Sequence, residues 1–225
     1  MLNVKRMRFP LQIILVCIRW YAAYALSYRN LEEMMQERGV TVDHSTVNRW
    51  AIRFLPLLEK IFRRKYKRPV GSSWRMDETY IKVNGDWQYL YRAVDKQGNT
   101  IDFLLRAKRD KVAARKFFEK AMTLHGDPEK VTMDKSGSNK AAMDEINQHR
   151  EVPIEVRQIK YLNNIVEQDH RSVKRITKPM MGFKSFRAAR NVLAGIELMH
   201  MIRKGQMMNE GSELSFAEQF YALAA

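Results

Sequence analysis

The chain has 225 residues, of which 45% are hydrophobic, so it can bury one sizeable core or two small ones, and this excludes wholesale disorder. Its 40 lysine and arginine residues outnumber 25 aspartate and glutamate residues, and the net charge of +15 favours a polyanionic partner, either nucleic acid or an acidic membrane surface. The single cysteine, Cys17, excludes an internal disulfide and a cysteine-based zinc site, and it indicates a reducing, cytoplasmic setting.

The first predicted element is a helix over residues 10–26. Its apolar stretch resembles a secretion signal, but Gln12 and Arg19 interrupt it, and it is too short to cross a bilayer. No other apolar run in the sequence is long enough for a membrane span. We therefore expect a cytoplasmic protein without a membrane partner.

Two further helices are predicted next, one after Ser27 that ends at Gly39 and one that begins after Asp43. Preceded by a supporting helix, they form the pattern of an all-α helix-turn-helix domain, which we assign to residues 1–59. The last of these helices would expose side chains able to contact the major groove of double-stranded DNA, namely Ser45, Thr46, Asn48, Arg49 and Arg53. A helical hairpin that binds no DNA would show the same pattern.

A basic linker is predicted over residues 60–73. It includes Arg63, Arg64 and Lys65, and it ends in proline, glycine and serine residues that break regular structure. Such a linker can follow backbone phosphates between two DNA-contacting parts.

Charge is distributed unevenly along the chain. Residues 1–70 hold 14 basic and 5 acidic side chains, residues 74–170 hold 17 and 16, and residues 171–204 hold 9 and 1. This pattern suggests a nearly neutral reaction core between two DNA-holding segments, with ordinary solvated surface as the alternative.

Beyond residue 73 the pattern changes to strands and then alternates between helices and strands. Strands are predicted over residues 74–83, 87–95, 99–106, 130–134 and 154–160, and helices over residues 110–124, 137–148 and 163–176. This order is that of an α/β, ribonuclease-H-like (retroviral-integrase-like) core, which we assign to residues 74–180. A C-terminal helix and an acidic tail, residues 181–225 with Glu210, Glu213 and Glu218, are predicted to pack on this core.

Three carboxylates occupy different elements of this predicted core. Asp77 lies in its first strand, Asp134 ends its fourth strand, and Glu167 lies in its last helix. Phosphodiester cleavage by two metal ions needs oxygen ligands that converge on one point, and hard oxygen ligands suit Mg²⁺ or Mn²⁺. A solvated surface carboxylate is the ordinary alternative for each acid alone, but the three together in this order predict a metal site.

Neighbouring acids are predicted to lie outside this site. Glu78 follows Asp77 on a strand and should point to the opposite face, and Asp169 is rotated by about 200° from Glu167 on a helix. The Glu167 stripe instead gathers Asn163, Asn164, His170, Arg171 and Lys174, of which Arg171 and Lys174 can contact DNA phosphate. Other acids are expected at the surface or in turns: Asp95, Asp102, Asp110, Asp144 and Glu145.

Two other chemistries have weak support. His200 and Arg203, with Tyr221 downstream, match a tyrosine-recombinase spacing, but the tail around Tyr221 is acidic, which disfavours attack on DNA. No glycine-rich phosphate loop is present in the sequence, so we expect no ATP-driven step.

The chain resembles the compact bacterial insertion-sequence transposases of the insertion sequence six family, which carry a DDE catalytic core. The resemblance extends to about residue 206 and rests on seven stretches, which are residues 27–35, 42–50, 74–80, 133–137, 161–164 with 167–170, 182–186 and 195–205. It implies that Asp77, Asp134 and Glu167 form the catalytic triad and that Lys174 is the basic residue that follows the glutamate in such cores.

The resemblance also implies a function. A Mg²⁺- or Mn²⁺-dependent polynucleotidyl transferase with two ions per site would cut the terminal inverted repeats of its element and join them to target DNA, giving cointegrates. Two ends must be joined together, so a homodimer or larger assembly is expected. Two alternatives are a non-catalytic helix-turn-helix DNA-binding regulator and a ribonuclease-H-like nuclease without strand transfer.

Overall fold

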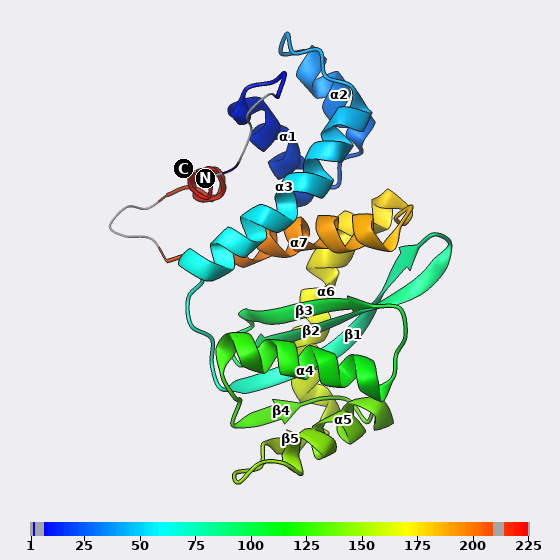
Figure 1. The fold of residues 1–225 in the computed structure, drawn as a ribbon, viewed down its shortest axis with the longest axis vertical. Coiled ribbons are helices and arrows are strands. Elements are labelled where there is room, and N and C mark those ends of the chain that lie inside the picture. The colour runs from blue at the N-terminus through cyan, green and yellow to red at the C-terminus, as the bar shows by residue number, and fades with distance from the viewer. Residues whose placement is uncertain (1, 3–6, 209–213, 225) are drawn as a thin grey trace. The chain divides into compact units, whose positions relative to one another are not determined.

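The computed structural model describes residues 2, 7–208 and 214–224, and the chain divides into two compact units (Figure 1). The helical unit joins Met1–Arg68 to Val173–Ala225, and the sheet unit spans Pro69–Ser172. Two glutamates of the tail predicted to be acidic, Glu210 and Glu213, lie outside the described residues.

The sheet unit is built on a mixed sheet whose strands run in the order β3-β2-β1-β4-β5 through the described part of the chain. Neighbours among the first three strands pair antiparallel, whereas β4 is parallel to β1 and β5 is parallel to β4. This arrangement confirms the predicted ribonuclease-H-like core. The strands are β1 (Ser73–Val83), β2 (Asp86–Asp95), β3 (Thr100–Arg106), β4 (Lys130–Thr132) and β5 (Glu155–Arg157).

The turn between β1 and β2 follows from its sequence. Asn84 and Gly85 have φ angles of 52° and 90°, which is the left-handed conformation that a two-residue hairpin turn requires and that asparagine and glycine adopt most readily. This turn sets the β1–β2 register, in which Asp77 lies opposite Arg92.

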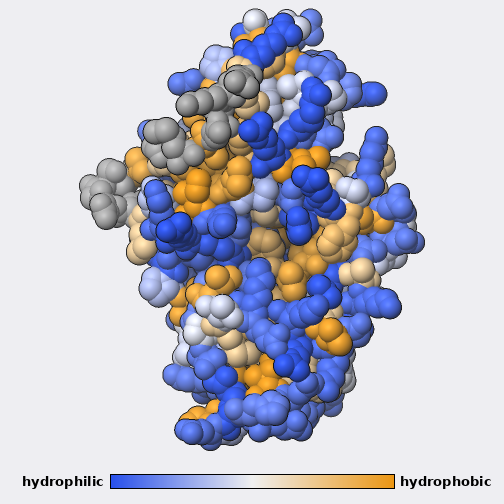
Figure 2. Space-filling view, viewed as in Figure 1, coloured by the Kyte–Doolittle hydropathy of each residue, from blue (hydrophilic) through white to orange (hydrophobic). Residues whose placement is uncertain are grey.

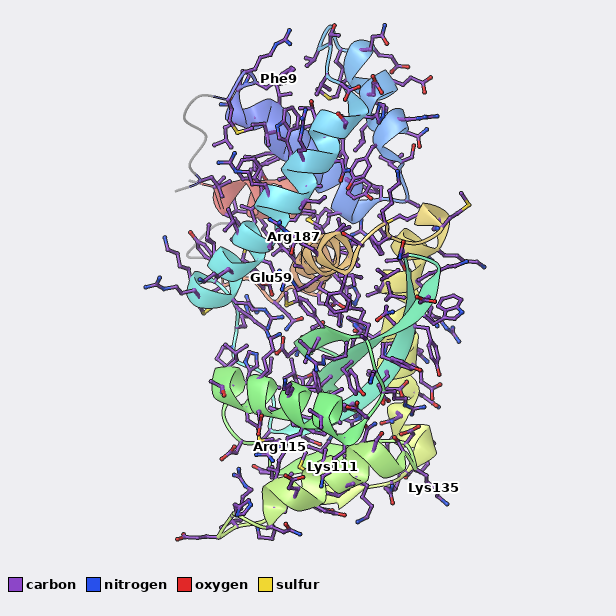
Figure 3. The ribbon with its side chains drawn as sticks, turned by 45° about the vertical axis from the view of Figure 1, so that its right-hand side comes forward. Phe9, Glu59, Lys111, Arg115, Lys135 and Arg187 are labelled. Carbon is purple, nitrogen blue, oxygen red and sulfur yellow. The ribbon has the colours of Figure 1, made fainter. Side chains whose placement is uncertain are left out.

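Four helical segments complete the sheet unit: α4 (Lys111–His125), α5 (Gly137–Asn147), the 3₁₀ turn η1 (Lys160–Asn163) and α6 (Asn164–Thr177), whose last turn is grouped with the helical unit. Alternation along β1 buries Trp74 and Met76 in a core with Phe117 and Phe118 of α4. Lys111 and Arg115 point from α4 toward α5, where both pair with Glu145 (Figure 3).

The helical unit contains α1 (Leu11–Ala23), α2 (Tyr28–Gln36), α3 (His44–Lys65), the 3₁₀ turn η2 (Lys178–Met180), α7 (Phe186–Arg203) and α8 (Phe216–Ala222). The N-terminal boundaries follow from side-chain caps. Ser27 forms a capping box with Asn30, and Asp43 accepts a hydrogen bond of 2.8 Å from the backbone N–H of Ser45. The φ of 73° at Gly39 ends the α2 segment.

The C-terminal helix differs from its prediction. It packs against α1 and α3 within the helical unit, whereas its sequence pattern predicted packing on the sheet domain. Side chains around most of the circumference of α7 are buried, and such a helix needs neighbouring helices to cover it.

Two further boundaries differ from the prediction. Residues 60–65 of the predicted linker continue α3, because their apolar side chains, such as the fully buried Phe62, keep the helical period. The tail forms α8, which Ser215 and Glu218 cap. Charged and polar side chains cover much of the face drawn in Figure 2. Among the described residues, no helix combines the length and apolar character of a membrane span.

Candidate active site

Asp77 lies in the middle of β1, on the face opposite the buried Met76, and its side chain is 19% exposed. Burial raises the pKa of the Asp77 carboxyl to about 7, and the negative charges of three neighbouring carboxylates add to the rise, although a hydrogen bond from the backbone N–H of Glu78 opposes it. Those neighbours are Glu78, Asp134 and Glu167. A carboxyl crowded in this way binds either a proton or a cation.

Asp134 reaches Asp77 through the register of the parallel strands. Arg75 of β1 is opposite Thr132 of β4, so two more residues along each strand bring Asp134 beside Asp77. The backbone N–H of Ser136 donates to the Asp134 carboxylate at 3.1 Å, which fixes the acid at the start of the loop before α5.

Glu78 also belongs to the cluster, contrary to the prediction that it points away. One carboxylate oxygen each from Asp77, Glu78 and Asp134 lie within 4.8 Å of one another. Alternation along a strand fixes the direction of Cβ but leaves the end of a longer side chain free to bend toward its neighbour. The sequence pattern therefore missed a group that the structure places here.

Arg109 lies beside this acid cluster, and the sequence pattern did not predict it there. Its Nε donates to Glu78 Oε1 at 3.0 Å, and its Nη2 lies 3.6 Å from Asp134 Oδ2. Asn139 of α5 donates to the same Glu78 oxygen at 3.2 Å. Both donors reach Oε1 of Glu78, whereas its buried Oε2 has no hydrogen-bond partner among the described residues.

The helix α6 lies on the Asp77 face of the sheet. Asn163, just before α6, donates from Nδ2 to the backbone carbonyl of Met76 at 3.2 Å, and His170 Nδ1 lies 3.7 Å from Asp77 Oδ2. Val166, between them, is fully buried. These three residues define the side of the helix that faces β1.

Asp169 and Glu167 lie on opposite flanks of that side. Asp169 turns toward the sheet and pairs with the fully buried Arg92 of β2 at 2.7 Å. Successive helix residues are rotated by about 100°, so Glu167 occupies the other flank. Because β2 and β4 border β1 on opposite sides, the Glu167 flank faces the β4 side, where Asp134 lies.

Glu167 itself is exposed. It does not join the described acids whose oxygens lie within 4.8 Å of one another, yet it is close enough to raise the Asp77 pKa. The exposed carboxylate of Glu167 therefore lies near Asp77 but outside the group of three acids, on the flank of α6 opposite Asp169.

Comparisons with known proteins agree with this geometry. Residues 71–206 match a family described as a DDE domain. The transposase for insertion sequence-like element IS431mec of Staphylococcus aureus (strain Mu50 / ATCC 700699) is 41% identical over 199 residues, which are 88% of this chain and 87% of that protein. This chain belongs to the insertion sequence six family of DDE transposases.

A second relative of the transposase matches this chain to the same extent, and a solved structure resembles part of it. The transposase for insertion sequence element IS257 in transposon Tn4003 of Staphylococcus aureus is also 41% identical over 199 residues, with the same coverage of both chains. Among solved structures, the HTLV-2 integrase catalytic core domain in complex with magnesium (dimeric form) is 15% identical, with a TM-score of 0.48, over 68% of this chain and 97% of that one.

Two acids of the transposase that were predicted at the surface or in turns are buried, and one of them, Asp95, holds the turn between β2 and β3. Asp95 is 1% exposed and accepts hydrogen bonds from the backbone N–H groups of Gly71, Gln97 and Asn99. Asp102 is fully buried, and Lys120 of α4 donates to it at 2.8 Å. Asp95 precedes a polar turn and Asp102 lies between the apolar Ile101 and Phe103, and only the tertiary contacts show which groups compensate these two charges.

The residues predicted to bind DNA differ in the solvent exposure of their side chains. Ser45, Arg49, Arg53, Arg64, Lys65, Arg171 and Lys174 are exposed, whereas Thr46, Asn48 and Arg63 are half-buried. Arg49 donates to Thr46 Oγ1 at 2.8 Å, and Arg63 pairs with Glu59 one helical turn earlier. The guanidinium of Arg63 therefore has a carboxylate partner within α3, and the exposed cations suit phosphate contact better.

Proposed function

We propose that this transposase binds the terminal inverted repeats of its insertion sequence and catalyses metal-dependent DNA cleavage and strand transfer, with Asp77, Asp134 and Glu167 as its catalytic triad. The convergence of carboxylate oxygens from Asp77, Glu78 and Asp134 within 4.8 Å carries the proposal, and burial together with these neighbouring charges raises the pKa of Asp77 to about 7. Perturbed carboxyl groups in a cluster are typical of catalytic sites, because a cation must offset their repulsion.

The donors in the cluster fit divalent cations with a preference for oxygen. Asp77, Glu78 and Asp134 each bring a carboxylate oxygen within 4.8 Å of the other two, and Glu167 faces the same side of the sheet as Asp134. We expect two Mg²⁺ or Mn²⁺ ions held by Asp77, Asp134 and Glu167. When bound, such ions activate the attacking oxygen and stabilise the leaving oxygen of a phosphodiester.

The neighbours of the triad give each acid a different role. Arg109 and Asn139 hold Oε1 of Glu78 through hydrogen bonds, so Glu78 is fixed beside the triad and adds negative charge to the site. His170, at 3.7 Å from Asp77, orients that carboxylate. Glu167, exposed near Asp77, completes the ligand set.

In this proposal, exposed side chains of α3 and α6 bind the DNA. Ser45, Arg49 and Arg53 of α3 contact the terminal repeats, with Thr46 and Asn48 behind them. Arg171 and Lys174 of α6, together with Arg64 and Lys65, contact phosphates. Two ends are processed together, so the active form is a homodimer or larger, and the joined products are cointegrates.

A joining assay tests the proposal. Labelled DNA from one end of the element is incubated with a supercoiled plasmid, Mg²⁺ and either wild-type protein or one of two variants. Asp77→Asn should lower joining by at least about a thousandfold, because it removes a metal ligand without changing the size of the side chain. Asp144→Asn, on the exposed surface of α5, is the matched control and should join normally.

The outcomes separate the proposal from its alternatives. Undiminished joining by Asp77→Asn contradicts the triad. Nicked but never joined products from the wild-type protein would instead support a nuclease. Binding of terminal DNA without nicking, in either Mg²⁺ or Mn²⁺, would support a regulator.

A further inference from the structure

The β1–β2 hairpin carries three aromatic side chains beyond the acid cluster, which we call the aromatic platform: Tyr80, Trp87 and Tyr89. The rings of Tyr80 and Trp87 are 6.3 Å apart in an edge-to-face arrangement, and those of Tyr80 and Tyr89 are 5.4 Å apart. Trp87 is 61% exposed and Tyr80 is 50% exposed. Large aromatic groups that pack on one another at the surface are typical of binding sites.

The platform starts two residues beyond Glu78 of the acid cluster, on the face of β1 that carries Glu78 and opposite the face that carries Asp77. Glu78, Tyr80 and Lys82 occupy every second position of β1 and therefore share one face. The register places Tyr80 opposite Tyr89 and Lys82 opposite Trp87. A strand rises about 3.3 Å per residue, so Tyr80 follows Glu78 by roughly 7 Å. That distance is about the length of one or two nucleotides. Arg109, which bonds to Glu78, is also near enough to Tyr80 for the two to interact electrostatically.

Cations surround the platform. Lys82 is exposed and lies opposite Trp87, Arg106 of β3 lies opposite Tyr89, and Lys108 is exposed just after β3. Aromatic rings among lysine and arginine side chains are the combination that binds unpaired bases, because the rings stack on bases and the cations hold phosphates. The same cations repel a second copy of this chain, whose net charge is +15.

We infer that Tyr80 and Trp87 stack on unpaired DNA bases next to the phosphate that the acid cluster cleaves. This inference rests on the proposed function and names the form of its substrate, an element end whose terminal base pairs are opened. In an intact duplex the faces of the bases are covered by their neighbours, so the platform has a surface to stack on only where pairs are broken.

Binding measurements with the full chain test this inference. Two labelled terminal-repeat duplexes are compared by fluorescence anisotropy in EDTA, one fully paired and one with three mismatched pairs at the cleavage point. Trp87→Ala and Tyr80→Ala should each weaken binding of the mismatched duplex by about tenfold and leave binding of the paired duplex unchanged. Trp87→Phe and Tyr80→Phe keep an aromatic face and should bind as the wild-type protein does.

A matched control separates stacking from loss of exposed apolar surface. Leu124 of α4 is 50% exposed, as Tyr80 is, and Leu124→Ala should leave both affinities unchanged. Trp87 fluorescence gives a second readout, since Trp50 and Trp74 are 3% and 1% exposed and Trp87 is the tryptophan most open to a base. The mismatched duplex should quench wild-type emission, and Trp87→Phe should remove most of that quenching.

Two results would overturn the inference. If Trp87→Ala binds each of the two duplexes with the same affinity as the wild-type protein does, no base stacks on Trp87. A Trp87→Ala variant that sediments as a smaller species, with unchanged DNA affinity, would make the platform an interface between copies. Because binding is measured without metal, a failure of wild-type joining in Mg²⁺ would count against the proposed function and leave this result standing.

Discussion

The two units of the transposase are stabilised in different ways. The sheet unit buries charged groups: Arg92 and Asp102 are fully buried and Asp95 is 1% exposed. In the helical unit, α7 packs its apolar side chains on α1 and α3, and among its described carboxylates Glu197 alone is fully buried. A buried charge is costly without a partner. The buried charges of the sheet unit therefore need an explanation, whereas the apolar packing of the helical unit does not.

The difference points to the acid cluster. Asp95 is bound by backbone N–H groups and Asp102 by Lys120, so each buried charge is compensated locally. Asp77 differs, because burial and three neighbouring acids raise its pKa. Asp95 and Asp102 are therefore part of the packing of the sheet unit, whereas Asp77 marks the place where a cation would offset negative charge.

The largest expected effect comes from breaking the buried pair between Arg92 and Asp169. Arg92→Met leaves the Asp169 carboxylate, 9% exposed, without its cation and should lower the free energy of unfolding by about 3 to 5 kcal/mol. Urea denaturation measures the loss, and hydrogen–deuterium exchange should localise it to the sheet unit. Lys140→Met breaks a pair in which both side chains are 48% exposed, and it should change stability little.

The same pair also tests how Glu167 is placed. The double variant Arg92→Met/Asp169→Leu replaces the pair by apolar groups and should recover most of the lost stability. Joining should stay low in this variant, because the apolar contact no longer fixes the rotation of α6 that turns Glu167 toward Asp134. Full recovery of joining together with stability would show that the pair serves folding alone.

A smaller effect is expected from the titration of Asp77. Its folded pKa is about 7 and its ordinary value is 3.8, so between these pH values the folded protein binds more protons than the unfolded chain. Metal-free stability should therefore fall as pH rises from about 4 to 7, by up to about 4 kcal/mol, and level off above that. Urea denaturation in EDTA across this range measures the slope.

Asp77→Asn supplies the comparison for this titration, because its amide has no proton to lose. Its stability should vary less with pH over the same range and should exceed that of the wild-type protein near pH 8. Added Mg²⁺ should stabilise the wild-type protein most at high pH, where the carboxylate is ionised. A wild-type profile as flat as that of Asp77→Asn would show that the crowding is relieved in some other way.

The sequence predicted the order of the elements because their signals are local. Asn84 and Gly85 specify the hairpin, Ser27 and Asp43 cap their helices, and alternation marks β1. The separation of Asp77, Asp134 and Glu167 onto three elements followed from that order. Local pattern was sufficient wherever one element alone decides the conformation.

Contacts between elements explain what the sequence did not predict. The position of Glu78 depends on Arg109 and Asn139, which are 31 and 61 residues away. The inward turn of Asp169 on α6 depends on Arg92, which lies on strand β2. The C-terminal helix was assigned to the wrong neighbours because its periodicity shows that it is buried without showing what buries it.

The smallest expected effect tests the apolar packing of the helical unit. A Cβ at Gly195 of α7 would lie 2.5 Å from a methyl carbon of Leu55 in α3, so Gly195→Ala should lower stability by about 1 to 3 kcal/mol, although alanine favours a helix. Hydrogen–deuterium exchange should place the loss in the helical unit. Gly137→Ala in α5 meets no atom within 4 Å and should cause no loss.

A second substitution distinguishes overpacking from a change in helix propensity. Leu55→Ala removes the side chain that Gly195 faces, and it should destabilise the protein by itself by about 2 to 5 kcal/mol. In the Gly195→Ala/Leu55→Ala double variant, the new methyl group occupies part of the space that the Leu55 side chain vacates. The double variant should therefore lose less stability than the two single variants lose in total. Simple additivity would mean that the two helices are not in contact at this point, and the contrast between a charge-sensitive sheet unit and a packing-sensitive helical unit would lose its basis.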